Sequence, residues 1–381
     1  MINKKKILLV YGTRPEAIKM APLYHELRQD KMFDVFTCVT AQHRSMLDGV
    51  LLLFDIKPDY DLDLMKKDQT LFDITSNILI NIQSVFEEVR PDVVLVHGDT
   101  TTAMTAALAA FYGQFKVGHV EAGLRTHDIT SPFPEELNRQ IISRIADFHF
   151  APTLNCKDNI SNEFQTKKSI EVTGNTVIDA LYWTLNKINS TPDLDSSLHN
   201  FFTTALNLDI KNTIYILITG HRRENFGKSF IEICEAIRVL ANKYPDMHFI
   251  YPVHLNPNVQ KPVHQILNGL KNVHLIEPLD YKEFVYLMNY CYFILTDSGG
   301  IQEEAPSLKK PVLVMRETTE RPEAIESGGV KLVGSDQEVI VKEASVLIDS
   351  KEKYLDMCIK SNPYGDGTAS NKIKFFLKDN L

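Results

Sequence analysis

The chain contains few cysteines: five in 381 residues, far apart and without a Cys-x-x-Cys pair. This scarcity disfavours a disulfide scaffold and a cysteine-bound zinc site, and it predicts reduced thiols in a cytoplasmic protein. The sequence also lacks an apolar run near the ~20 residues that a membrane-spanning helix needs. Its first apolar run, residues 7–11, is too short for a signal peptide, so we expect no membrane partner.

Cofactor and metal signatures are missing too. Without a Gly-x-Gly-x-x-Gly motif after the first apolar run, the sequence lacks the fingerprint of nicotinamide-dinucleotide binding. The absence of a Gly-x-x-x-x-Gly-Lys-Ser/Thr motif argues against P-loop phosphoryl transfer. The twelve histidines are dispersed and form no His-Glu-x-x-His motif. We therefore expect neither a cofactor nor a metal.

The composition is that of an ordinary globular protein. Hydrophobic residues make up 44% of the chain and charged residues 24%, which excludes a disordered or collagen-like chain. The net charge of −8 argues against a broad basic face for nucleic acid, although it is compatible with a local basic pocket. At ~100–200 residues per domain, the length predicts two domains.

Short continuous apolar runs alternate with longer amphipathic stretches in both halves of the chain. This alternation predicts an α/β fold with two doubly wound parallel sheets, each covered by helices on both faces. The expected strands are residues 7–11, 35–40, 93–96, 117–120, 214–219, 249–251, 273–276, 293–296 and 312–315. Helical spacing marks residues 71–89 and 370–378, and the polar stretch 189–200 is expected to be a loop.

In open parallel sheets, ligands bind beyond the carboxyl ends of the strands. After the first expected strand, Thr13 and Glu16 have the spacing of a capping box, and Pro15 suits a first helical turn. Arg14 and Lys19 add positive charge at this helix N-terminus, which favours an anion site there. The alternative is a well-capped helix with two solvated bases.

Several carboxylates follow later strands. Asp99 comes directly after the third expected strand, where an aspartate is most often an N-cap, whereas Glu121 follows the fourth strand and has no capping role. Glu135 and Glu136 lie in the first turn of a helix that Pro134 begins, where interaction with the helix dipole is the alternative explanation. Crowded carboxylates raise one another's pKa, so we predict acid–base chemistry at this rim.

The second half places basic and glycine-rich segments at equivalent positions. His221, followed by two arginines, comes after the first strand of this half and suits contact with a phosphate or leaving group. A surface basic patch is the alternative. The turn Ser298-Gly299-Gly300 at a helix start offers backbone N–H groups to a phosphate. Glu303 or Glu304 is placed to accept hydrogen bonds from a ribose, and Arg321 follows the last expected strand.

Together these segments resemble the non-hydrolysing UDP-N-acetylglucosamine 2-epimerases of bacteria. The resemblance covers nearly the whole chain, and the motifs occur in the family's order. They are Gly12-Thr-Arg-Pro-Glu-Ala-Ile-Lys19, His97-Gly-Asp-Thr100, His119-Val-Glu-Ala-Gly-Leu-Arg125, Pro132-Phe-Pro-Glu-Glu136, Gly220-His-Arg-Arg-Glu224, Asp297-Ser-Gly-Gly-Ile-Gln-Glu-Glu304, Arg321-Pro-Glu323 and Asn362-Pro-Tyr-Gly-Asp-Gly367.

The resemblance implies a GT-B fold, in which two Rossmann-like domains face each other across the active-site cleft and the C-terminal helix returns to the first domain. The N-terminal domain, with the catalytic acids, is expected at 1–170 plus 366–381, and the UDP-binding domain at 171–365. A cytoplasmic homodimer that supplies UDP-N-acetylmannosamine for bacterial surface polysaccharide is also implied. The implied catalytic residues are Asp99, Glu121, Glu135 and His221; the implied substrate contacts are Arg14, Lys19, Phe284, Ser298, Gly299, Gly300, Glu304 and Arg321.

Bacterial members of this family often bind a second UDP-N-acetylglucosamine as an activator. Gln42, His43 and Arg222 match that allosteric site. Ser45, however, stands where Glu or Gln is usual, and Asp68 stands where Arg is usual. An acid that faces a diphosphate is unfavourable, so allosteric activation is a hypothesis to be tested.

The implied reaction is reversible epimerisation at carbon 2. No carbonyl neighbours the C2–H bond, so the implied route eliminates UDP, passes through 2-acetamidoglucal and re-adds UDP. The sequence leaves open which carboxylate serves which face of the ring. The alternatives are a hydrolysing 2-epimerase that releases UDP and N-acetylmannosamine, an enzyme for a modified UDP-sugar, a GT-B glycosyltransferase and a nucleotide-sugar sensor. The last two fit the dense set of carboxylates poorly.

Overall fold

The computed structural model describes residues 4–40, 44–64, 69–164, 169–359 and 361–381, with residues 44–46 described by their backbone only. The chain divides into two compact units, residues 1–182 with 364–381, and residues 183–363. Among the described helices, none has the length and apolar character needed to cross a membrane.

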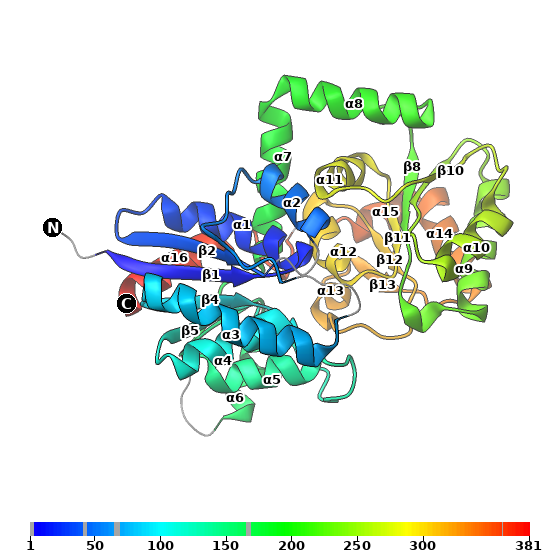
Figure 1. The fold of residues 1–381 in the computed structure, drawn as a ribbon. Coiled ribbons are helices and arrows are strands. Elements are labelled where there is room, and N and C mark those ends of the chain that lie inside the picture. The colour runs from blue at the N-terminus through cyan, green and yellow to red at the C-terminus, as the bar shows by residue number, and fades with distance from the viewer. Residues whose placement is uncertain (1–3, 41–43, 65–68, 165–168, 360) are drawn as a thin grey trace. The chain divides into compact units, whose positions relative to one another are not determined.

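The first unit is built on a seven-stranded parallel sheet in the order β3-β2-β1-β4-β5-β6-β7 (Figure 1). Its strands are β1 (Lys5–Tyr11), β2 (Phe33–Val39), β3 (Tyr60–Asp61), β4 (Val93–His97), β5 (Lys116–Val120), β6 (Phe148–Ala151) and β7 (Ser169–Val172). Its helices are α1 (Arg14–Arg28), α2 (Arg44–Leu53), α3 (Leu71–Val89), α4 (Thr101–Tyr112), α5 (Glu135–Ile145), α6 (Leu154–Glu163) and α16 (Ala369–Asn380). Helix α7 (Thr176–Ser190) begins in this unit and ends in the other.

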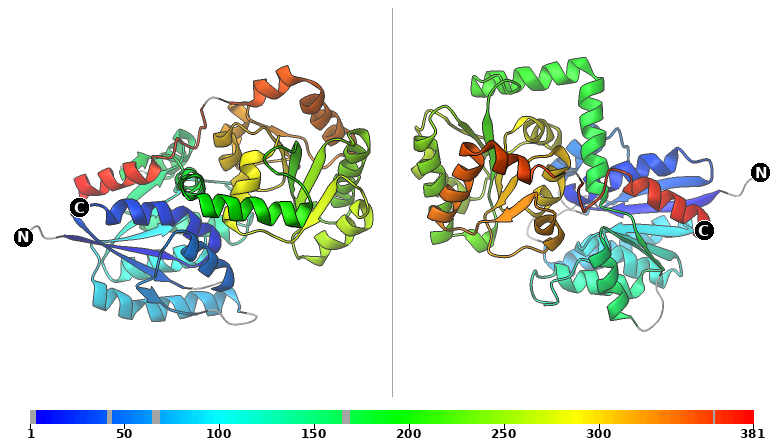
Figure 2. Two further views of the ribbon diagram at one scale, coloured as in Figure 1. Left: turned by 90° about the horizontal axis from the view of Figure 1, so that it is seen from above. Right: turned by 180° about the vertical axis from the view of Figure 1, so that it is seen from behind.

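Helices cover both faces of this sheet (Figure 2). Helix α3 occupies the predicted residues 71–89, because its apolar side chains recur on one face, and Ile82, Val85 and Phe86 are buried in the core with the alanines of α4. On the other face α16 packs along α1. Lys378 pairs with Asp30 at 2.9 Å, and Phe376 meets the rings of Phe148 and Phe150. The C-terminal segment therefore belongs to the first unit.

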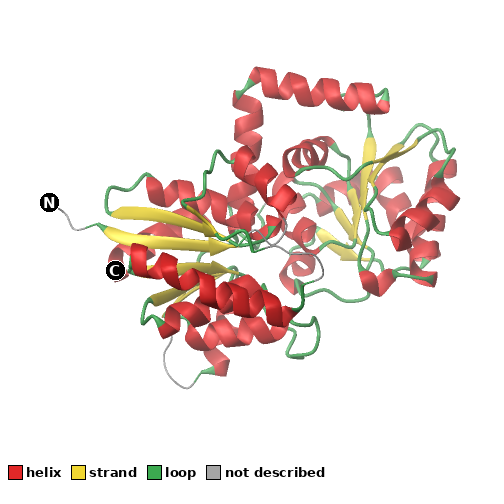
Figure 3. Ribbon diagram, in the orientation of Figure 1, coloured by secondary structure: helices red, strands yellow, loops and turns green. Residues whose placement is uncertain are grey.

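The second unit is a six-stranded parallel sheet in the order β10-β9-β8-β11-β12-β13 with helices around it (Figure 3). The strands are β8 (Tyr215–Thr219), β9 (His248–Pro252), β10 (Val273–Ile276), β11 (Ile294–Thr296), β12 (Val312–Val314) and β13 (Val330–Leu332). The helices are α8 (Pro192–Leu206), α9 (Lys228–Lys243), α10 (Pro257–Leu267), α11 (Tyr281–Tyr290), α12 (Gly299–Glu304), α13 (Pro322–Glu326), α14 (Gln337–Asp349) and α15 (Lys351–Met357). Both sheets are parallel and doubly wound, as predicted.

Two expectations differ from the structure. The segment 189–200, expected to be a loop, is largely helical, because Pro192 begins α8 and the buried Leu198, Phe202 and Leu206 line one face of it. The boundary expected between residues 170 and 171 lies instead at 182, because β7 pairs with β6 as the last strand of the first sheet. The return to the first unit falls at 364 rather than 366.

Candidate active site

The turn between β1 and α1 is organised by a buried glutamate. Thr13 caps α1, and Glu16 completes the predicted capping box. The Glu16 carboxylate accepts hydrogen bonds from the backbone N–H groups of Gly12 at 3.1 Å and Thr13 at 2.8 Å, and from the Thr100 hydroxyl at 2.7 Å. Burial raises the pKa of Glu16 above its ordinary value, because its effect is larger than that of these hydrogen bonds, which lower the pKa. Because Thr100 is the N-cap of α4, Glu16 ties the two helix starts together at the carboxyl ends of β1 and β4.

Glu121 lies at the carboxyl end of β5 in an unusual backbone conformation. Its φ of 63° falls in the left-handed region, which residues with a side chain seldom adopt outside functional sites. The carboxylate forms an ion pair with Lys19 of α1 and accepts a hydrogen bond from the Asn175 amide at 2.7 Å. His97 Nε2 lies 3.8 Å from the same oxygen. Burial lowers the pKa of His97 to about 4, so this imidazole is neutral near pH 7.

Asp99 follows β4, the strand that neighbours β5. A Cβ atom on the preceding residue, Gly98, would be 3.5 Å from Glu121 Oε1, so the two strand ends are close. The Asp99 carboxylate is bound by Arg139 of α5, which also donates to Glu136 at 3.0 Å. Burial alone would raise the pKa of Glu136, but hydrogen bonds outweigh it and hold this pKa below its ordinary value.

Glu135, the third predicted acid, lies half-buried in the first turn of α5, one helical turn before Arg139. Its neighbour Glu136 is fully buried, and its carboxylate accepts hydrogen bonds from Arg139, Thr126 and Gln140 that hold it in place. The two adjacent glutamates therefore differ: Glu136 is buried and holds the start of α5 in place, whereas Glu135 is half-buried.

The corresponding site of the second unit surrounds Asp297 at the end of β11. This carboxylate is fully buried, and its Oδ2 accepts the backbone N–H groups of His221 at 2.9 Å and Arg222 at 2.8 Å. Asn225 donates to the same oxygen at 3.3 Å. Asp297 thus fixes the loop after β8 that carries His221, and its Oδ1 faces the His221 Nδ1 at 3.9 Å.

The His221 imidazole stacks on His254, with ring centres 5.1 Å apart and an angle of 12° between the planes. Its side chain is 45% exposed. The pKa of His221 lies below its ordinary value, because partial burial and the neighbouring His254 and Arg222 outweigh the attraction of Asp297. A neutral imidazole at this position can accept or donate a hydrogen bond near pH 7.

The predicted glycine turn begins α12, with Ser298 as its N-cap. The Arg321 guanidinium lies directly against Gly299: a Cβ atom there would be 2.5 Å from Arg321 Nη1, so a larger residue would displace the guanidinium. Arg321 Nε donates to the fully buried Glu303 at 2.6 Å. Glu304 accepts a hydrogen bond from the Tyr281 hydroxyl at 2.6 Å. Backbone N–H groups and a guanidinium therefore meet at one strand end, an arrangement suited to phosphate.

Two further predicted substrate contacts are half-buried: Arg14 lies in the first turn of α1, and Phe284 lies on α11. Arg222 lies in the loop after β8, held through its backbone by Asp297. Gln42 and His43, the other two residues matched to the activator site, lie outside the described residues.

Sequence reasoning assigned no site role to three residues that the structure places in these networks: Arg139, Asn175 and Asp297. Each bonds to a predicted site residue that is distant in the chain, such as Asn175 to Glu121 across 54 positions. Among the described residues, no group of three or more His, Cys, Asp or Glu side chains is arranged to hold a metal ion.

The fold defines a class of protein. Two doubly wound units of parallel strands and helices make up the GT-B fold, which occurs in enzymes that act on nucleotide sugars. A likeness to the MurG structure of Acinetobacter baumannii, with a TM-score of 0.57 and 13% identity, concerns the fold alone.

The chain belongs to the UDP-N-acetylglucosamine 2-epimerase family, whose sequence profile matches residues 25–378. It is 56% identical to the UDP-N-acetylglucosamine 2-epimerase of Yersinia pestis over 374 residues, which cover 98% of each chain. It is 55% identical to that of Campylobacter jejuni over 374 residues, 97% of this chain and 96% of the relative. The crystal structure of the Neisseria meningitidis UDP-GlcNAc 2-epimerase, bound to UDP-GlcNAc, matches with a TM-score of 0.91 and 51% identity over 98% of this chain and all of that one (100%).

Proposed function

We propose that the protein interconverts UDP-N-acetylglucosamine and UDP-N-acetylmannosamine by eliminating and re-adding UDP. The observation that carries this proposal is the pair of carboxylates at neighbouring strand ends, Asp99 with Arg139 and Glu121 with Lys19. A glycosyltransferase needs an acceptor site and fewer acids. The relatives compared above are bacterial enzymes named for this epimerisation, which supports the same activity here.

The chemistry explains why the site needs several acids. The C2–H bond has no adjacent carbonyl, so direct removal of its proton would leave an unstabilised carbanion. If the C1–O bond to UDP breaks as a carboxylate removes the C2 proton, the electron pair forms the C1=C2 double bond of 2-acetamidoglucal. An acid then returns a proton to the opposite face of C2, and UDP attacks C1. We propose that Asp99, Glu121 and Glu135 supply the groups for the two faces.

The leaving diphosphate carries the charge that develops during elimination. We propose that the turn at Ser298, Gly299 and Gly300 and the guanidinium of Arg321 bind it, with His221 as a further contact. Arg321 is already oriented by Glu303 at 2.6 Å. Arg14, Lys19, Phe284 and Glu304 are proposed as further contacts to the nucleotide sugar. Preformed donors of this kind stabilise a developing charge without reorganising during the reaction.

Proton NMR of UDP-N-acetylglucosamine with the enzyme in D2O, without added NAD, tests the proposal. Appearance of UDP-N-acetylmannosamine with deuterium at carbon 2 of both epimers supports elimination and re-addition. Accumulation of UDP and free N-acetylmannosamine would instead identify the hydrolysing reaction. An unchanged spectrum would refute the proposed substrate. The variant Asp99→Asn should lose turnover while retaining measurable UDP binding.

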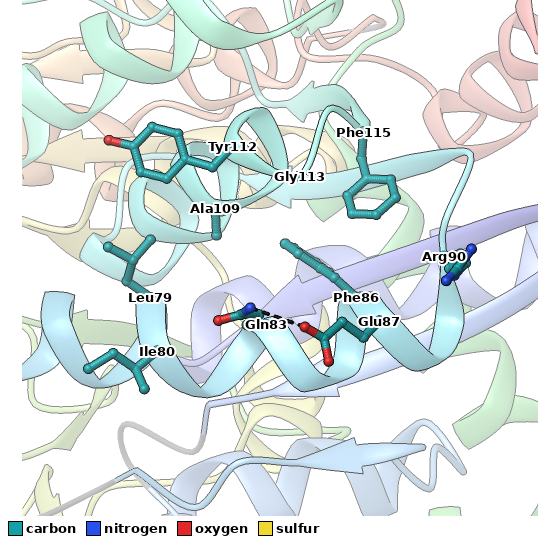
Figure 4. A pocket seen from close by; sticks show the side chains of 10 residues that line it. All are labelled: Leu79, Ile80, Gln83, Phe86, Glu87, Arg90, Ala109, Tyr112, Gly113 and Phe115. Atoms are coloured by element: carbon teal, nitrogen blue, oxygen red, sulfur yellow. Dashed lines mark hydrogen bonds between the residues drawn. The ribbon is translucent and has the colours of Figure 1, made fainter.

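We also propose that the chain acts as a homodimer through the outer surface of the first unit. A groove of about 700 Å³ runs between α3 and α4 (Figure 4). Two of its lining residues, Ile80 and Tyr112, are 69% and 66% exposed, and exposed apolar patches often mark interfaces. Glu87 and Arg90 both line the groove, so a two-fold contact can pair opposite charges. Sedimentation should give a dimer mass for the wild type and a monomer mass for Ile80→Glu.

A cytoplasmic location and a role in surface polysaccharide synthesis complete the proposal. All five cysteines are free, as is usual in a reducing compartment. Detection of UDP-N-acetylmannosamine-derived sugars in the surface polysaccharide of the parent cell, and their loss on deletion of this protein, tests the role.

A further inference from the structure

Asn175 connects the acid Glu121 with the two places where the chain leaves and re-enters the first unit. Its side chain is buried, with 2% of the residue exposed, between β7 and α7. Its amide Nδ2 donates to Glu121 Oε2 at 2.7 Å, and its Oδ1 accepts the Val177 N–H at the start of α7 at 3.0 Å. A backbone N–H can only donate, so the atom facing Val177 is the oxygen and the NH2 group faces Glu121.

The backbone of the same residue holds the returning chain. The Asn175 N–H donates to the carbonyl oxygen of Tyr364 at 2.7 Å, and Tyr364 is the first residue of the returning segment. Gly174 and Gly365 flank this contact with φ values of 90° and 118°. A Cβ atom on Gly174 would lie 3.0 Å from the Tyr364 oxygen, so glycine permits the close approach. One residue therefore contacts the outgoing helix, the returning segment and the acid.

We propose that Asn175 is a positioning residue for Glu121, which holds the acid in place and couples it to the outgoing and returning segments of the chain. The inference rests on the proposed epimerase function for its kinetic consequences. The contact itself, however, is measurable without turnover. A purely structural amide would stabilise the fold and leave the titration of Glu121 unchanged.

Several charged or titratable groups face Glu121 and set the background for a test. Lys19 from α1 pairs with its carboxylate, and His97 from β4 lies 3.8 Å from it. His119 from β5 also interacts with Glu121 electrostatically, but burial lowers the pKa of His119 to about 3, so it is uncharged near neutral pH. Lys19 is therefore the positive charge among these contacts, and Asn175 supplies the neutral donor.

The test replaces Asn175 with an acid of the same shape. Asn175→Asp keeps an oxygen for the Val177 N–H but places a carboxylate against Glu121, which should raise the pKa of Glu121 by about one unit or more. Asn175→Ala adds no charge but removes both the donor to Glu121 and the acceptor of the Val177 N–H, so it should raise the same pKa by less. Carbon-13 NMR of protein labelled at the glutamate carboxyl carbons, with Glu121→Gln to assign the signal, reports both shifts.

The matched control is Asn272→Asp in the second unit. Asn272 is also buried, and its amide donates to the carbonyl oxygens of Ala241, Tyr244 and Met247. This control should lower the unfolding temperature and leave the Glu121 titration and the pH profile of turnover as in the wild type.

Kinetics give the second readout. In Asn175→Asp, kcat at pH 7 should fall at least tenfold, the limb of the pH profile that Glu121 controls should move to higher pH, and the Kd of UDP should stay within twofold. An unchanged Glu121 titration in both Asn175 variants would overturn the inference. If the wild type shows no epimerisation, the proposed function fails, and the NMR titration still decides the role of Asn175.

Discussion

Arg139 offers a direct test of how the first site is held together, because it binds two carboxylates at once. Its side chain is 11% exposed, that of Asp99 is 26% exposed and that of Glu136 is fully buried. The variant Arg139→Met keeps the length and apolar stem of the side chain and removes the charge. Among the described residues, Glu136 then keeps two donors, the Thr126 N–H and the Gln140 amide, each at 3.1 Å.

The size of the effect follows from burial. Breaking a fully buried ion pair costs about 3–5 kcal/mol and breaking an exposed pair about 0–1 kcal/mol. Because Asp99 is partly exposed and Glu136 keeps two donors, we expect a loss of about 2–3 kcal/mol in the free energy of unfolding. For a unit of this size that corresponds to a fall of roughly 5–10 °C in the unfolding temperature.

The pH dependence gives the sign of the same effect. The folded-state pKa of Glu136 is lowered, so the stability that this group contributes is complete above the unfolded-state value of about 4.3 and is lost as the pH falls through the folded-state value. Arg139→Met should therefore lose less stability than the wild type between about pH 5 and pH 3.

Urea unfolding and turnover assays measure both consequences. Besides the stability loss, kcat should fall about 10- to 100-fold, because about 1.4–2.8 kcal/mol of the positioning of Asp99 is lost, while UDP binding is retained. The control is Lys157→Met, which changes an exposed cation on α6 of the same unit and should alter stability by less than about 0.5 kcal/mol. Wild-type stability and kcat in Arg139→Met would refute the reasoning.

Three further predictions concern the second site and its regulation. In Gly299→Ala the new methyl group displaces the Arg321 guanidinium, so the Kd of UDP measured by calorimetry should rise about tenfold or more, and unchanged binding would remove this contact from the diphosphate site. Arg316 lowers the pKa of Glu320 to about 2, although burial would raise it. The free energy of unfolding of Glu320→Gln should therefore be about 2–3 kcal/mol below that of the wild type at pH 7, and this difference should shrink as the pH falls from about 4.5 towards 2. A constant difference across that range would contradict the prediction. If UDP-N-acetylglucosamine activates the enzyme through the site matched by Arg222, small additions should speed the initial rate of the reverse reaction, and an unchanged rate excludes activation.

The sequence predicts the sheets best where the strands are continuous apolar runs. β1, β4 and β8 lie within a few residues of their expected positions, because strands buried on both faces carry apolar residues throughout. The sequence does not predict β6 or β7. β6 contains a buried histidine, His149, and β7 is short and polar. Helix α8 is not predicted for a related reason, because its polar residues outnumber the three buried apolar residues on its inner face.

The site likewise contains residues that the sequence predicts and residues that it does not. The positions of Asp99, Glu121 and His221 beyond strand ends were predictable because each follows an apolar run, and the carboxyl ends of parallel strands share one edge of a sheet. The residues that hold these groups were not, because their contacts depend on the tertiary fold. Arg139 reaches Asp99 across 40 positions, and Asp297 reaches the loop with His221 across 76. The spacing of neighbouring residues in the sequence does not indicate contacts between residues so far apart in the chain.

Cleavage and re-formation of the C1–O bond is the central claim of the proposed mechanism, and positional isotope exchange tests it most directly. UDP-N-acetylglucosamine carrying oxygen-18 in the bridge between C1 and the β-phosphorus is incubated with enzyme, and recovered substrate is examined by phosphorus NMR. If UDP leaves and returns, the label should move into the non-bridging β-phosphoryl positions as the epimer forms. Accumulation of UDP-N-acetylmannosamine with the label still in the bridge would contradict the account, because the sugar would then have been inverted without elimination of UDP.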